Sequence, residues 1–258
     1  MTDEFGGVSV VVTGAAQGIG RAIAEQFYAM GARLLLLDCN EAGVSEVAKS
    51  LRKEGSPAVS CLVVDLADPL AIEVLAPQVQ ALLGGVDVLI NNAGIELDLP
   101  LEKISAEAFD RVIAVNLRSP LLLSQALVPL FPVIGGAIVN ISSIHADHAF
   151  PNAIPYACSK AGLMALTRNL ALELAPRRIR VNAICPGYID TPMWDEWLRS
   201  TSNPEEAARE TESLHPLGRR GLPCDVASAA IYLAGSQSIW ITGTSLVVDG
   251  GLTVRTHP

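Results

Sequence analysis

A tyrosine and a lysine four positions apart are the residues of this chain best suited to acid–base chemistry. Tyr156 and Lys160 stand at the start of a long Ala- and Leu-rich segment, so on a helix both side chains emerge from one face. Lowering a phenol pKa from about 10 to about 7 requires roughly 4 kcal/mol of preference for phenolate. An ammonium about 4 Å away supplies on the order of 4 kcal/mol at an effective dielectric constant near 20. With Ser143 at the end of the preceding apolar run, the pair can form an acid–base site. Taken alone, the pattern fits an ordinary exposed pair better, so the rest of the chain has to decide.

The composition favours small-molecule chemistry in a single domain. Half of the 258 residues are hydrophobic, which suits one large α/β core, and no linker divides the chain. A net charge of −9 argues against nucleic acid and anionic membrane as partners. The five dispersed cysteines, without C-x-x-C, are typical of reduced thiols. The first residues lack signal-peptide features, and no apolar run approaches the roughly 20 residues of a spanning helix, so we expect a cytoplasmic protein.

The first sixty residues have the pattern of a dinucleotide site. A β-branched run at 8–12 leads into TGAAQGIG and a helical pattern that stops near Gly31. The glycines of this turn would let the backbone approach a pyrophosphate at a helix N-terminus. Asp38 follows a second strand at about 20 residues from the glycines, where a carboxylate binds the adenosine ribose of NAD and repels the 2′-phosphate of NADP. Since neither Gln17 nor Cys39 is a cation that could hold such a phosphate, we expect NAD.

Strands and helices continue to alternate along the chain. Strands are expected at 33–37, 58–64, 86–90, 135–141, 179–184 and 245–248, and helices at 41–54, 69–83, 105–131, from Tyr156 to Pro176 and at 223–234. Asn152 is a candidate cap of the Tyr156 helix. Asn116 lies among apolar residues of the long helix, so its amide is either satisfied in the core or catalytic. Residues 190–216 read as a long, polar and irregular loop with one short acidic helix-like stretch, which is typical of a substrate lid.

The motifs TGAAQGIG, NNAG, Asn116, Ser143, Tyr-x-x-x-Lys and Pro186-Gly187 occur in this order along one chain. Together they closely resemble the short-chain dehydrogenase/reductase family over essentially the whole length. The resemblance implies one Rossmann-type, doubly wound α/β domain over 1–258, with a parallel sheet of about seven strands and a lid at about 188–217. It also implies a nicotinamide cofactor and a homotetramer or homodimer.

The resemblance also implies roles for these residues. Tyr156 would exchange a proton with the substrate oxygen, and Lys160 would lower the tyrosine pKa and bind the nicotinamide ribose. Ser143 would hold the substrate oxygen, and Asn116 would hold a water that connects Lys160 to solvent. The cofactor would lie along Gly14, Gln17, Gly18, Ile19, Gly20, Asp38, Asp65, Leu66, Asn92, Ala93, Gly94, Tyr156, Lys160, Pro186, Gly187, Ile189 and Thr191. This chemistry needs no metal, so none is expected at His145, Asp147 and His148.

The substrate is less defined by these patterns. SSIHADHAFP is similar to segments of glucose dehydrogenases of this family, and TPMWDEWLRS resembles the lid of sugar- and hydroxysteroid-oxidising members. Ser143, His145 and Trp194 are the candidate substrate residues; His145 could equally be a solvated loop histidine, and the tryptophans could instead form a subunit contact.

The expected function is NAD-dependent hydride transfer between the nicotinamide and a secondary alcohol of a sugar or polyol. One alternative is a carbonyl reductase of 3-oxoacyl thioesters or of a hydrophobic or steroid ketone. The alternative from another class is a non-catalytic NAD-binding regulator, against which the intact set of four catalytic residues argues.

Overall fold

A seven-stranded parallel sheet forms the centre of the computed structural model, which describes residues 4–52 and 58–255. The strands are β1 (Ser9–Thr13), β2 (Arg33–Asp38), β3 (Val59–Val63), β4 (Val88–Asn91), β5 (Gly136–Ile141), β6 (Ile179–Pro186) and β7 (Ser245–Val248). Their order in the sheet is β3-β2-β1-β4-β5-β6-β7, and every pairing is parallel. The order reverses between β1 and β4, which confirms the predicted doubly wound α/β fold and places a ligand crevice at the carboxyl ends of these strands.

The central strands are continuous apolar runs because both faces of the sheet are covered. Successive side chains of a strand point to opposite faces. In β1, Val10 and Val12 belong to one core cluster and Val11 to the other. Leu34 and Leu35 of β2 divide in the same way. A strand that is buried on both sides cannot alternate with polar residues, which is the pattern of parallel sheets.

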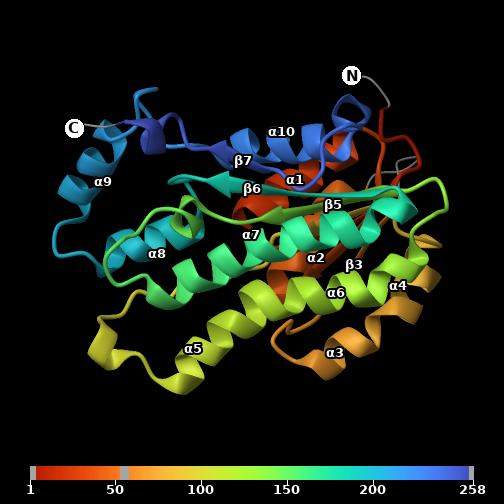
Figure 1. The fold of residues 1–258 in the computed structure, drawn as a ribbon, viewed down its shortest axis with the longest axis horizontal. Helices are drawn as coiled ribbons and strands as arrows, with labels where there is room; N and C mark the ends of the chain where they lie inside the picture. The colour runs from red at the N-terminus through yellow and green to blue at the C-terminus, as the bar shows by residue number, and fades with distance from the viewer. Residues whose placement is uncertain (1–3, 53–57, 256–258) are drawn as a thin grey trace.

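The helices form a layer on each face of the sheet (Figure 1). One core cluster joins α1 (Gly18–Ala29), α2 (Glu41–Leu51) and α10 (Pro223–Ala234). On the other face lie α3 (Pro69–Glu73), α4 (Leu75–Leu83), α5 (Ala106–Ile113), α6 (Ser119–Leu127) and α7 (Ile154–Leu174). Helices α8 (Pro192–Ser200) and α9 (Pro204–Ser213) lie together at one end of the molecule, at the left of Figure 1.

Two long helical patterns are interrupted in the structure. The 69–83 segment breaks at Val74, because Pro77 lacks the N–H group that would continue the α3 ladder into α4. The 105–131 segment contains a π-helical turn at Ala114–Arg118, which holds Asn116. The expected helix at 41–54 ends at Leu51, and residue 54 lies outside the described residues.

The prediction of an irregular loop at 190–216 was wrong, as was the predicted Asn152 cap. Prolines at the first turns of α8 and α9, with Thr191 and Asn203 as caps, start two helices in that segment. The capping position of α7 is Ala153, which has no side-chain hydrogen bond. Asn152 lies one residue earlier in the left-handed backbone region, with φ of 62°, and so cannot cap.

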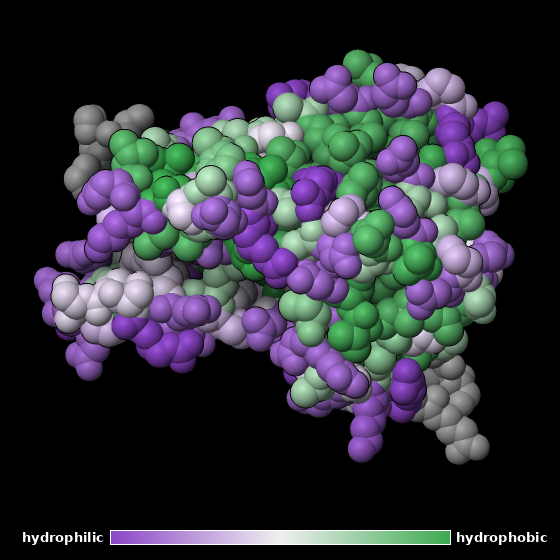
Figure 2. Space-filling model, turned by 90° about the horizontal axis from the view of Figure 1, so that it is seen from below, coloured by the Kyte–Doolittle hydropathy of each residue, from purple (hydrophilic) through white to green (hydrophobic). Residues whose placement is uncertain are grey.

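Segment Ala106–Leu130 is long and apolar enough to span a bilayer by length and composition. Half of its most apolar window is buried in the fold, where α5 contacts α7 and α6 contacts α3 and α4. Figure 2 looks onto this side of the molecule, where hydrophobic and polar groups are interspersed. The segment is therefore a core element of the domain that keeps a partly exposed face.

Truncation of Leu123 in α6 tests the core beneath the sheet. Leu123 is fully buried, whereas Leu121 of the same helix is 45% exposed. Because a buried leucine loses both its transfer free energy and its packing, we expect Leu123→Ala to lower the free energy of unfolding by about 2–5 kcal/mol. The matched Leu121→Ala should change it by about 0.5 kcal/mol or less. Urea unfolding at one protein concentration measures both, and equal losses would contradict the assignment of Leu123 to the core.

Candidate active site

A cavity of about 650 Å³ opens at the carboxyl ends of the strands, at the reversal of strand order. The structure brings nearly all of the predicted site residues to its wall. These are Gly14, Gln17, Gly18, Ile19, Asp38, Asp65, Leu66, Asn92, Ala93, Gly94, Ser143, His145, Tyr156, Lys160, Pro186, Gly187, Ile189, Thr191 and Trp194. Gly20 and Asn116 are not on the wall but lie behind it.

The glycine turn after β1 is shaped as a cradle for a pyrophosphate. Gly14 has φ of +64°, and a Cβ there would lie 2.8 Å from the Cα of Ala93. A Cβ on Gly20 would lie 2.1 Å from the carbonyl oxygen of Gly14, so Gly20 permits the turn to close rather than facing the cavity. The Asn92 amide donates to the carbonyls of Thr13 and Gly14 at 2.9 and 3.1 Å. The first turn of α1 has no side-chain cap, which leaves its N-terminus suited to an anion.

Asp38 lies at the end of β2 beside this turn. Its two carboxylate oxygens accept hydrogen bonds from the backbone N–H groups of Ala16 and Asn40, both at 2.9 Å. These bonds fix the carboxylate at the cavity wall and leave oxygen lone pairs for the two hydroxyls of a ribose. The turn, the free helix end and this carboxylate together fit a dinucleotide cofactor.

Arg111 of α5 also reaches this end of the cavity, which the sequence pattern did not reveal. Its guanidinium pairs with Asp65 at 3.0 Å. A hydrogen bond from the Ala67 backbone, together with Arg111, holds the pKa of the Asp65 carboxyl below its usual value. Arg111 is therefore a cation in the part of the cavity that Asp38 and Asp65 line, and it is already paired with the Asp65 carboxylate.

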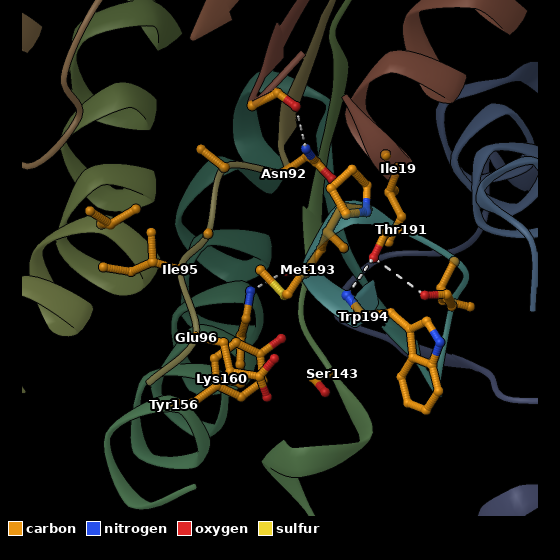
Figure 3. Close-up of a pocket in the computed structure, with 18 of the residues that line it drawn as sticks. Ile19, Asn92, Ile95, Glu96, Ser143, Tyr156, Lys160, Thr191, Met193 and Trp194 are labelled. Carbon is orange, nitrogen blue, oxygen red and sulfur yellow. Dashed lines mark hydrogen bonds between the residues drawn. The ribbon is translucent and has the colours of Figure 1, made fainter. Parts of the chain in front are cut away.

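Helix α7 places Tyr156 and Lys160 one turn apart over the end of β5. Lys160 is 3% exposed, and its Nζ donates to the carbonyl oxygen of Ile141 at 2.8 Å. The same Nζ lies 5.4 Å from the centroid of the Tyr156 ring. Ser143 follows β5 and lies on the same cavity wall as the Tyr156 phenol, whose pKa its hydroxyl acts to lower. Figure 3 shows Tyr156 and Lys160 on one side of the cavity and Ser143 facing them.

Burial sets the proton affinities of this pair. It raises the pKa of the Tyr156 phenol, as does the negative field of Glu96, and the Ser143 hydroxyl opposes them. Burial also lowers the pKa of Lys160 to about 8. The sequence predicted that Lys160 lowers the pKa of Tyr156, but in this structure the net shift is upward. The reason is that the burial of the phenol, which no spacing reveals, and the negative field of Glu96 raise the pKa more than the Ser143 hydroxyl lowers it.

Asn116 lies behind the cavity with its amide fully engaged. Its Oδ1 accepts from the Ile95 N–H, and its Nδ2 donates to the Ile95 carbonyl, both at 2.9 Å. Nδ2 also donates to Ser159 Oγ at 3.0 Å, and Ser159 donates to the carbonyl of Tyr156. Asn116 therefore ties the loop after β4 to the catalytic helix, and its predicted role in holding a water stays a prediction.

Aromatic rings form a further part of the cavity wall, and one of them, His145, packs edge-on against Tyr156 with ring centroids 5.3 Å apart. Trp194 and Trp197 of α8 stack with ring centroids 4.8 Å apart, and Tyr188 contacts Trp194 at 5.5 Å. His145 stacks on Phe150 at 4.0 Å, and burial lowers the pKa of its imidazole to about 4. His145 is thus a neutral ring in the cavity rather than a solvated histidine, and Trp194 lies beside the site as predicted.

Two carboxylates of the cavity were missed by the sequence analysis. Glu96 and Asp98 follow the NNAG motif in the loop after β4. Burial raises the pKa of both carboxyl groups, and that of Glu96 reaches about 7. Their position shortly after a cofactor-binding glycine was the available signal. Among the described residues, no group of three or more His, Cys, Asp or Glu side chains is placed to hold a metal ion.

Known proteins match this chain along almost all of its length. A family model described as enoyl-(acyl carrier protein) reductase matches residues 14–253. A 3beta-hydroxysteroid dehydrogenase 1 of Eggerthella lenta is 39% identical over 257 residues, covering 98% of this chain and 97% of that protein. The chain belongs to the short-chain dehydrogenase/reductase family. It is an oxidoreductase of that family, whose members bind a nicotinamide cofactor.

Other members of the short-chain dehydrogenase/reductase family differ in their described substrates. A 3-oxoacyl-(acyl-carrier-protein) reductase of Thermotoga maritima is 38% identical over 246 residues, covering 95% of this chain and 97% of that protein. A solved structure from Beutenbergia cavernae, assigned as an NAD(P)-dependent gluconate 5-dehydrogenase, has NADP bound at low occupancy. It superposes with a TM-score of 0.90 at 34% identity, covering 99% of this chain and 100% of that one. The predicted family and fold are confirmed.

Replacement of Asp38 tests how the adenosine end selects a cofactor. We expect Asp38→Ala combined with Cys39→Arg to weaken NADH binding by about 10- to 100-fold, because hydrogen bonds to a charged group are lost. NADPH binding should tighten, because a carboxylate is replaced by a guanidinium that can pair with the 2′-phosphate. Titration of the reduced-nicotinamide fluorescence measures both affinities without a substrate. Asp68→Ala, at the cap of α3 outside the cavity, is the control, and an unchanged NADH affinity in the double variant would contradict this role of Asp38.

Proposed function

We propose that this short-chain dehydrogenase/reductase uses NAD to oxidise a secondary alcohol of a sugar or polyol. The observation that carries the proposal is the arrangement of Tyr156, which shares the cavity wall with Ser143 and has the buried ammonium of Lys160 5.4 Å from its ring centroid. This is the geometry of a general base with a partner that holds the same substrate oxygen.

The chain's own residues would position the alcohol and remove its proton. Ser143 holds the substrate oxygen at Tyr156. Tyr156 takes the hydroxyl proton as phenolate, the form that its burial disfavours and the neighbouring Lys160 ammonium favours, as the carbonyl forms. The Ile141 carbonyl accepts a hydrogen bond from Lys160, so the ammonium is already positioned beside the phenol and needs no reorientation before the reaction. Residues of this wall, among them Lys160 and Gly94, would hold a nicotinamide, which would supply the acceptor for the hydride of the carbinol carbon. Gly94 lies close to Lys160, since a Cβ there would meet Nζ at 3.4 Å, and this leaves room for a ring against the ammonium.

The preference for NAD rests on Asp38. A 2′-phosphate next to this carboxylate would be repelled, and its two backbone hydrogen bonds keep it from turning away. Arg111 is the cation nearby, but it is bound to Asp65. The gluconate 5-dehydrogenase relative with bound NADP makes the opposite preference the alternative to test.

A polyhydroxy substrate is supported by the two walls of the cavity. Aromatic rings such as Trp194 and Trp197 stack on the apolar face of a sugar, and carboxylates such as Glu96 accept hydrogen bonds from its hydroxyls. The described substrate of the Eggerthella lenta relative favours a steroid as the second candidate, and the aromatic wall would suit it. The carboxylates of Glu96 and Asp98 on the cavity wall would not suit an apolar steroid.

We propose in addition that the enzyme is a cytoplasmic homotetramer or homodimer. The partly exposed face of the Ala106–Leu130 segment supports an association of this kind. Sedimentation velocity measures the state directly, and a species of 27.2 kDa would contradict it.

Tyr156→Phe tests the reaction. We expect the rate of alcohol oxidation to fall by about 10²- to 10⁴-fold, which is the range for a lost general base, while NADH binding remains. The measurement is absorbance growth at 340 nm with NAD across aldoses, polyols, hydroxysteroids and simple secondary alcohols. Tyr232→Phe is the matched control, because it makes the same change on α10, outside the cavity, and should leave the rate unchanged.

Three results would contradict the proposal. Unchanged turnover in Tyr156→Phe would remove the tyrosine from the mechanism. Oxidation of NADPH by ketones or 3-oxoacyl thioesters, with no alcohol turned over, would establish the reductase alternative. Tight NAD binding without turnover of any alcohol or ketone would establish the non-catalytic regulator.

A further inference from the structure

The α8–α9 segment, residues 190–220, begins and ends at one junction. The Gly221 N–H donates to the Tyr188 carbonyl, and the Asp190 N–H donates to the Gly221 carbonyl, both at 2.9 Å. A parallel β-bridge accompanies these two hydrogen bonds. The two ends of the segment are therefore bound to each other, and its helices extend from this junction, where Arg220 lies.

Arg220 connects three parts of the α8–α9 segment. Its Nε donates to the Asp190 carboxylate at 2.7 Å, and its Cζ lies 5.0 Å from the centroid of the Trp194 ring in α8. One terminal nitrogen donates to the carbonyl of Ala208 in α9 at 3.5 Å. The Arg220 side chain is 18% exposed and is not among the described groups that line the cavity. Any effect of Arg220 on a substrate must therefore pass through the residues that it holds.

Trp194 is the residue through which Arg220 reaches the cavity. The indole is buried, lines the cavity and contacts both the Arg220 guanidinium and the ring of Trp197, whose centroid is 4.8 Å away. A cation over an indole is attracted by the negative face of the ring, and more strongly where water is excluded. Because a guanidinium is planar and weakly hydrated, it can lie over the ring while its Nε stays paired with Asp190. The contact therefore holds the indole in the cavity wall.

The start of α8 is held independently on the side of the glycine turn. Thr191 lines the cavity and caps α8, since its hydroxyl accepts a hydrogen bond from the Trp194 N–H at 3.3 Å (Figure 3). A Cβ on Gly18 would lie 3.3 Å from the Thr191 methyl group, so this residue packs closely on the glycine turn. The cofactor side of α8 therefore does not depend on Arg220, whereas the position of the Trp194 ring does.

We propose that Arg220 is a positioning residue for the substrate, which holds the Trp194 indole in the cavity wall and so sets how closely that wall packs against a bound alcohol. This inference rests on the proposed function, because it takes the cavity at Tyr156 as the alcohol site. The contacts of Arg220 among the described residues reach neither Tyr156 nor the glycine turn. Its loss should therefore weaken substrate binding and leave cofactor binding and proton transfer in place.

Acrylamide quenching of tryptophan fluorescence tests the contact without any substrate. The chain has three tryptophans, and Trp240 is 97% exposed, so a Trp240→Phe background leaves only Trp194 and Trp197 to report. On that background we expect Arg220→Gln to raise the quenching constant at least about 2-fold, because the buried indole loses the cation that holds it. Arg220→Lys, which keeps the charge but gives up the planar group, should raise it by a smaller factor.

The neighbouring Arg219 provides the matched control. It also pairs with an aspartate, Asp225 of α10, at 2.7 Å, and its hydrogen bonds among the described residues reach that carboxylate and the Arg220 carbonyl but neither α8 nor α9. Arg219→Gln should leave the quenching constant at the wild-type value. Equal constants in both Arg220 variants and the control would overturn the proposal.

Steady-state kinetics with NAD measures the consequence for the substrate. The probes are D-glucose, xylitol and cyclohexanol. For each one that is turned over, we expect Arg220→Gln to raise KM about 3- to 30-fold, the range of a lost cation–π contact. The value of kcat should change by less than about 3-fold, because the groups that move the proton are unchanged. Arg219→Gln should change neither constant.

A double-mutant cycle shows whether Arg220 acts through Trp194. Once Trp194→Phe has removed the indole, adding Arg220→Gln should raise KM much less than it does alone, because the two residues share one contact.

The split between the kinetic constants separates this role from a merely structural one. A fall in kcat with KM unchanged, a weakened NADH affinity, or additive effects in the cycle would overturn the inference. If no alcohol is turned over, the proposed oxidation fails, whereas the quenching still decides whether Arg220 holds Trp194.

Discussion

A lysine ammonium buried without a carboxylate partner is the constraint on which the active site depends. Lys160 donates to the Ile141 carbonyl at the end of β5, and no ion pair reaches it among the described residues. A buried cation is costly, and burial accordingly lowers its pKa to about 8. The strand end, helix α7 and the close approach of Gly94 together fix the ammonium, so none of these three elements can shift independently.

The position of the cavity is set by the reversal of strand order between β1 and β4. The loops after β1 and β4 diverge there, and the glycine turn, Asp38 and the Asn92 contacts form the cofactor wall. The loop after β4 then continues to Glu96, so one segment lines both the cofactor wall and the part of the cavity near Tyr156. Its anchor is Asn116, which a π-helical turn presents toward Ile95.

Sequence reasoning succeeded where local patterns are strong. The β-branched runs, the helix patterns and the glycine turn predicted nearly every element, because a parallel sheet buried on both faces requires continuous apolar strands. It failed at positions where the backbone conformation depends on capping residues or on the surrounding loop. The α3–α4 break at Pro77 was available from the sequence, but the two helices of the 190–216 segment depend on caps within a stretch of low hydrophobicity. Asn152 illustrates the same limit, because its left-handed backbone is set by the loop.

The sequence by itself determined the family, the fold and the identity of the residues that surround the cavity, because these depend on residue types and on their order along the chain. Only the tertiary structure decided how those groups behave. Burial reverses the expected direction of the Tyr156 pKa shift, and it makes His145 a neutral stacked ring. It also places Glu96, a residue without a motif, among the catalytic groups. Desolvation and electrostatic fields depend on distances between segments far apart in sequence, and no spacing within one segment encodes them.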